Sequence, residues 1–129
     1  MIMKRLILAS IAMFQAGAVL AQGLPAREAT CVTTRIAKLE HRLQAGEKGS
    51  FIADSGSAVV YANGGYQVAY DELPAVGRAR VGDAVILCLI RLPRGCPPGD
   101  TRGRIYTATD LRTMESWTMA DSGHGCGGA

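Results

Sequence analysis

Four cysteines constrain this chain more than any other feature of its sequence, because all of them follow a segment with the pattern of a secretory signal. They are Cys31, Cys88, Cys96 and Cys126. A small exported domain with an even number of cysteines is typically stabilised by disulfides. We therefore expect two disulfide bonds, formed in an oxidising compartment.

The N-terminal segment predicts a removable signal peptide. A basic start is followed by an apolar run over 6–14 and then by small residues. This run is shorter than the roughly 20 residues of a membrane span, so we expect no stable membrane anchor. Cleavage before Gln22 is favoured, with cleavage before Val19 as the alternative. The expected organisation is a signal peptide over 1–21 and one periplasmic or secreted domain over 22–129.

Signal cleavage also changes the charge balance. The whole chain has 14 basic and 11 acidic residues, a formal charge of +3. Cleavage after Ala21 removes Lys4 and Arg5, which leaves 12 basic residues against 11 acidic ones in 129 − 21 = 108 residues. Such a domain has room for one modest core, and its charge of +1 gives no support for a nucleic-acid partner.

Short runs of β-branched and aromatic residues predict several strands. They cover 57–62, 66–70, 83–92, 104–110 and 115–119. The first two flank Asn63-Gly64-Gly65, whose residues accept the positive φ of a tight hairpin. The run over 83–92 has the length and the valine and isoleucine content of a buried strand.

The segment 31–43 decides between two fold classes. Its apolar residues recur at helical spacing, whereas its β-branched residues favour a strand, which we prefer. Five to six strands predict an all-β domain, a small curled antiparallel sheet or barrel that is OB-like or SH3-like. An N-terminal helix over 31–43 would give the α+β alternative. Trp117 and the four tyrosines are interpreted as core or barrel wall rather than as a stacking platform.

The sequence permits three disulfide pairings. Cys88 lies in an apolar run and Cys96 just past a Pro/Gly turn, so these two can close a short local loop. That pairing leaves Cys31 to bond Cys126 and to tie the start of the domain to its tail. We favour Cys88 with Cys96 and Cys31 with Cys126.

An arginine-rich segment gives the best indication of a partner. Its arginines are Arg78, Arg80, Arg91, Arg94, Arg102, Arg104 and Arg112, against three acidic residues. Arginine binds phosphate and carboxylate groups through two parallel hydrogen bonds. Arg102, Arg104 and Arg112 are therefore candidates for binding an anionic ligand. Alternatively, these side chains shield edge strands and pair with Asp and Glu across the sheet.

Two other motifs suggest chemistry only weakly. Asp54-Ser55-Gly56 resembles the nucleophile segment of chymotrypsin-like serine proteases, but that fold needs two barrels, and we interpret the motif as a polar turn. Asp121, His124 and Cys126 have ligand chemistry, but an oxidising compartment assigns Cys126 to a disulfide. We expect no metal, no cofactor and no catalytic residues.

Several segments together resemble a family of small, exported, functionally uncharacterised bacterial proteins. The most specific are Cys96-Pro97-Pro98-Gly99-Asp100 and the C-terminal Cys126-Gly127-Gly128-Ala129, and the likeness extends over most of the domain. The resemblance implies export and a shared small fold, and it brings no catalytic residues with it.

The sequence therefore predicts an exported, non-enzymatic binding or accessory domain. Its expected partner is an anionic ligand or another exported protein. An inhibitor of a partner protein is one alternative, because it would have the same size and the same disulfides. A small hydrolase that uses His124 with Asp121 or a serine is the less favoured one.

Overall fold

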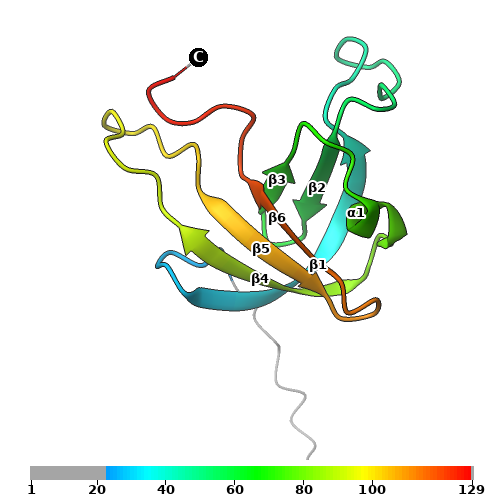
Figure 1. The fold of residues 1–129 in the computed structure, drawn as a ribbon, viewed down its shortest axis with the longest axis horizontal. Helices are drawn as coiled ribbons and strands as arrows, with labels where there is room; N and C mark the ends of the chain where they lie inside the picture. Colours follow the sequence, from blue (N-terminus) through cyan, green and yellow to red (C-terminus); the bar gives the residue numbers. More distant parts are fainter. Residues whose placement is uncertain (1–22, 129) are drawn as a thin grey trace, which may run out of the picture.

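The computed structural model describes residues 23–128 as a six-stranded barrel with one short helix (Figure 1). The elements are β1 (Thr30–His41), β2 (Ser57–Tyr61), β3 (Tyr66–Val68), α1 (Pro74–Arg78), β4 (Ala84–Arg91), β5 (Ile105–Asp110) and β6 (Ser116–Ala120). The predicted signal peptide lies outside the described residues. Within 23–128, no helix is long and apolar enough to cross a membrane.

All neighbouring strands are antiparallel, and the sheet closes in the order β1-β2-β3-β6-β5-β4. The long strand β1 makes closure possible because it has two partners. Its first half, Thr30–Arg35, pairs with β4, and its second half pairs with β2 beyond an irregularity between Ile36 and Lys38. Such an irregularity bends a strand and increases its twist. The structure confirms the small all-β fold, and the alternative helix over 31–43 is wrong.

The predicted hairpin is present as β2 and β3. Gly64 has φ of +87°, the left-handed region that glycine enters without a steric penalty. The turn closes through a 2.8 Å hydrogen bond from the Tyr61 amide to the Gly65 carbonyl, and the Asn63 side chain accepts from the Gly65 amide at 3.2 Å. The Asn-Gly-Gly sequence therefore sets the turn from its own backbone preferences.

Apolar side chains from every long strand fill the barrel. They include Ile36, Val59, Val85, Leu87, Leu89, Ala108 and Met119. The polar side chain of Gln67 is also fully buried, in the middle of this core. It accepts from Tyr61 Oη at 2.5 Å and from Trp117 Nε1 at 3.0 Å, and its amide donates to the Tyr106 carbonyl at 2.7 Å. Tyr61, Tyr106 and Trp117 are thus core, as the sequence indicated, whereas the side chains of Tyr66 and Tyr70 are exposed, so the interpretation was wrong for these two.

The helix α1 was not expected from the sequence. Pro74 stands in its first turn, where proline is favoured because its missing N–H is not needed there. Val76 is buried and packs into the core cluster with Ala79. One helical turn between β3 and β4 therefore covers one side of the barrel.

The disulfides are Cys31–Cys88 and Cys96–Cys126, so the favoured pairing was wrong. Cys88 lies inside β4, where Cys31 of β1 is its direct partner across the two strands. Cys96 lies beyond the end of β4, and Cys126 follows β6. Because β4 ends where β5 begins and β6 ends, the loop after β4 and the C-terminal tail meet at one end of the barrel.

Candidate functional site

The three candidate anion-binding arginines do not form one surface. Arg102 and Arg104 precede β5, whereas Arg112 follows it, so they lie at opposite ends of that strand. Arg102 Nη2 is 2.8 Å from Asp100 Oδ2. Arg112 Nε is 2.9 Å from Asp83 Oδ1, and its Nη2 donates to the Arg78 carbonyl at 2.8 Å. Two of the three guanidinium groups are therefore held by carboxylates of the same chain.

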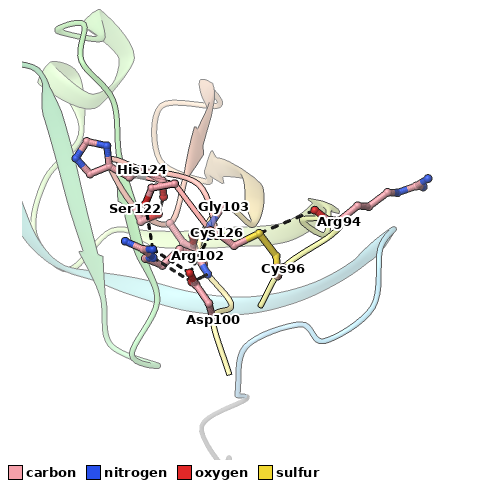
Figure 2. Close-up of polar contacts among 11 residues, drawn as sticks. Arg94, Cys96, Asp100, Arg102, Gly103, Ser122, His124 and Cys126 are labelled. Atoms are coloured by element: carbon pink, nitrogen blue, oxygen red, sulfur yellow. Dashed lines mark hydrogen bonds and ion pairs between the residues drawn. A yellow bond between two sulfur atoms is a disulfide. The ribbon is translucent and has the colours of Figure 1, made fainter. Parts of the chain in front are cut away.

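Figure 2 shows how the C-terminal tail is held. Asp100 Oδ2 accepts from Arg102 at 2.8 Å and from the Gly127 amide at 3.0 Å, next to the Cys96–Cys126 disulfide. The ring of His124 points away from the pair formed by Asp100 and Arg102 (Figure 2). The glycine-rich tail forms no helix or strand, but the side chains of Asp100 and Cys96, from the loop after β4, fix its path.

The residues considered as metal ligands have other roles. Asp121 Oδ1 accepts from the amides of Gly103 (2.8 Å) and Arg104 (3.1 Å), and Cys126 is in a disulfide. His124 is exposed, and its own carbonyl accepts a short hydrogen bond from Ser122 Oγ. Among residues 23–128, no group of His, Cys, Asp and Glu side chains has the arrangement of a metal site.

Ser55 stabilises a turn, as the sequence interpretation held. Its buried hydroxyl donates to the Ile52 carbonyl at 2.6 Å and accepts from the Leu43 amide at 3.0 Å. The hydroxyl therefore uses its proton and a lone pair in hydrogen bonds to backbone groups at the two ends of the loop between β1 and β2.

A different pair of arginines flanks an open groove of about 440 Å³ at the end of β4. Its lining residues are Arg91, Leu92, Pro93, Arg94 and Gly103, and we call it the arginine groove. Within the described part of the chain, neither Arg91 nor Arg94 has a side-chain partner. Figure 2 shows Arg94 extending away from the Asp100–Arg102 pair. The sequence included both residues in the arginine-rich segment but did not single them out.

The walls of the arginine groove are fixed by contacts from three segments. The Leu92 amide donates to Glu28 Oε1 at 2.9 Å, and the Cys96–Cys126 bond ties the following loop to the tail. Gly103 has φ of +103°, and a Cβ there would lie 3.4 Å from Gly125 Cα. A groove held in this way has less conformational entropy to lose when a ligand binds.

A second pocket, of about 200 Å³, lies where β1 ends. Its walls include Leu39, His41, Phe51, Ser57, Glu72 and Val76, and we call it the His41 pocket. His41 Nδ1 is 2.7 Å from Glu72 Oε1. Sequence reasoning missed this pair because His41 and Glu72 are far apart in the chain. The pairing of β1 with β2 sets His41 opposite Ser57, and Ser57 in turn bonds Asp71 and Glu72.

The ion pair between Asp83 and Arg112 makes stability depend on pH. The hydrogen bond from Arg112, and then that from the Arg80 amide, lower the pKa of Asp83 to about 2 from its ordinary 3.8. Because the folded-state pKa is depressed, the stabilisation is present above about pH 4 and lost as the pH falls toward 2. We expect the melting temperature of Asp83→Asn to fall less steeply than that of the wild type over this range. Parallel melting curves for the two proteins would contradict the assignment.

In comparisons with known proteins, no family model, no curated protein and no solved structure matches this chain. The resemblance carried by the Cys96–Asp100 and C-terminal segments therefore stays a prediction. Functional inference consequently starts from the two surfaces described above.

Proposed function

We propose that this protein is an exported, non-enzymatic binding module whose partner presents anionic groups to Arg91 and Arg94. The observation that carries the proposal is a pair of guanidinium groups that have no partner among residues 23–128 and flank a groove with fixed walls. Guanidinium groups bind carboxylate, sulfate and phosphate oxygens through paired hydrogen bonds. Arg102 and Arg112 make such bonds already, to Asp100 and Asp83, so they have less to offer a ligand.

Export is supported by the redox state of the cysteines. All four are in disulfides, which persist in oxidising compartments. The predicted signal peptide provides the route of export, and the proposed location is the periplasm or the external medium. Binding is favoured over hydrolysis by the way Asp121 and His124 are used, since the Asp121 carboxylate accepts two backbone amides and does not orient the imidazole.

The test measures affinity and its salt dependence. We expect purified protein to bind heparin, a sulfated polysaccharide, and the Arg91→Ser/Arg94→Ser variant to bind at least about tenfold more weakly, equivalent to about 1.4 kcal/mol. The slope of affinity against salt should also become shallower, because fewer charge contacts are screened. Isothermal titration calorimetry at several salt concentrations measures both quantities.

A matched control removes the same charge elsewhere. Lys38→Gln/Arg80→Gln takes two positive charges from exposed positions, and Arg80 precedes β4 whereas the groove follows it. Equal weakening in the control and in the groove variant would mean diffuse charge attraction and would overturn the groove assignment. Polyglutamate and vesicles containing phosphatidylglycerol, titrated in the same way, distinguish carboxylate and phosphate partners from sulfate ones. If the protein binds none of the three probes, heparin, polyglutamate or the vesicles, the result counts against an anionic partner.

A further inference from the structure

The His41 pocket lies on the other side of the molecule from the arginine groove. β1 begins beside the end of β4, at the pair Thr30 and Leu89, and it ends beside the start of β2, at the pair His41 and Ser57. Figure 1 shows α1, which contributes Val76 to the pocket, on the side of the barrel away from the end of β4. The two surfaces are thus separate and can be tested independently.

The polar wall of the pocket consists of hydrogen-bond acceptors held in place. Glu72 accepts from His41 Nδ1 at 2.7 Å, from the Gly56 amide at 3.4 Å and from Ser57 Oγ at 3.5 Å. The hydrogen bond from His41 is the main reason that the pKa of Glu72 is lowered, so this side chain is a carboxylate at neutral pH. His41 Nδ1 donates to this carboxylate and so holds it in place at the pocket wall.

The Ser57 hydroxyl is committed to the backbone and to Glu72. It accepts from the Leu73 amide at 2.8 Å and donates its proton toward the carboxylate. It therefore has no proton to offer a ligand. Among the described residues, those that line the pocket include no lysine and no arginine.

The remaining walls are apolar. Leu39, Phe51 and Val76 face the same space, and Val76 is buried while Phe51 is exposed at the rim. A volume of about 200 Å³ admits one long side chain rather than a large cofactor. An aromatic ring at the rim also attracts cations through its π face. Acceptors opposite apolar walls are complementary to an aliphatic stem that ends in N–H donors.

The segments around the opening carry more acidic than basic residues. Over 42–56 and 70–73 the acidic residues are Glu47, Asp54, Asp71 and Glu72, and the basic ones are Arg42 and Lys48. Arg42 is already engaged, since its Nε donates to the Ser55 carbonyl at 2.7 Å and its guanidinium lies 4.2 Å from the centre of the Tyr70 ring. The described lining residues themselves include two glutamates, Glu40 and Glu72, which favour the approach of a positively charged group.

We propose that the His41 pocket receives a lysine or arginine side chain from a basic segment of an exported partner protein. The ammonium or guanidinium group lies against the Glu72 carboxylate beside the His41 ring, and the aliphatic stem packs between Leu39, Phe51 and Val76. The molecule then has two binding surfaces of opposite preference, one for anions at the end of β4 and one for basic side chains at the end of β1.

The experiment titrates the protein with Nα-acetyl-lysine methylamide and follows its two histidines by NMR. We expect the ring resonances of His41 to shift saturably with the lysine probe and with the corresponding arginine probe. The norleucine analogue has the stem without the charge and should leave them unchanged. His124, the other histidine of the chain, is the internal reference for non-specific effects.

Two variants test the assignment of the charge. Glu72→Gln should weaken lysine-probe binding at least about tenfold, whereas Glu47→Gln, at an exposed position in the loop between β1 and β2, should leave it within about twofold. If Glu72→Gln does not fold, His41→Gln with amide resonances of Phe51 and Val76 as the readout replaces it. Equal shifts with the norleucine analogue, or equal shifts at His124, would overturn the proposal. So would binding of the lysine probe by Glu72→Gln as strong as that by Glu47→Gln. Arg91→Ser/Arg94→Ser should bind the lysine probe normally, so failure here is distinct from failure of the anion site.

Discussion

Replacing Gln67 with leucine is expected to lower the free energy of unfolding by about 3 kcal/mol, because it leaves buried hydrogen-bonding groups without partners. Gln67 is fully buried and joins Tyr61, Trp117 and the Tyr106 carbonyl in one network. After the substitution the buried Tyr61 Oη loses its acceptor. Burial also raises the pKa of the Tyr61 hydroxyl, so this group cannot relieve the loss by ionising near neutral pH.

The matched control is Tyr61→Phe, for which we expect a loss of only about 1 kcal/mol. Trp117 Nε1 lies 3.1 Å from Tyr61 Oη but also 3.0 Å from Gln67 Oε1, so it keeps an acceptor when the hydroxyl is removed. Urea unfolding followed by far-ultraviolet circular dichroism and by fluorescence of the single tryptophan measures both variants. Equal destabilisation by the two substitutions would show that Gln67 is not the centre of the network.

The strands could be predicted from the sequence because their signals are local. Alternation over 104–110 and the turn Asn63-Gly64-Gly65 act within a few residues, and the structure places β5 and the β2–β3 turn there. The short helix α1 gave no such signal, since one turn has too few residues for helical periodicity. Its position follows from Val76, which is buried against core residues that come from distant strands.

The disulfide pairing and the candidate sites depend on long-range order that the sequence does not display. Cys88 is closer in sequence to Cys96, but the pairing of β1 with β4 sets it opposite Cys31. The arginine-rich segment was visible, but which of its members are neutralised depends on Asp83 and Asp100, whose positions are set by folding. Arg91 and Arg94 stand out only once those ion pairs are known.

Removing the Cys31–Cys88 bond by substitution of both cysteines with alanine is expected to destabilise the domain by about 4 kcal/mol. The bond closes a loop of 57 residues. In the chain-entropy model, removing a bond that closes a loop of this length stabilises the unfolded state by that amount, because the chain regains conformational entropy. A domain of this size has a total free energy of unfolding of only about 5–15 kcal/mol, so this loss removes a large part of the stability of the folded state. Because neither cysteine lines the arginine groove, and the loop that carries Arg94 keeps its own disulfide to the tail, heparin affinity of the folded fraction should be retained.

The Cys96→Ala/Cys126→Ala variant separates stability from the site. Its loop of 30 residues predicts a loss of about 3.5 kcal/mol, close to that of the other pair. Here, however, the loop after β4 is released from the tail, and we expect heparin binding to weaken as well because Arg94 is no longer held beside Arg91. Urea unfolding and calorimetry on both variants measure the two effects. Retained affinity in the Cys96→Ala/Cys126→Ala protein would show that the groove does not depend on its disulfide. Peptide mapping of the unreduced wild-type protein would reveal any pairing other than Cys31–Cys88 and Cys96–Cys126.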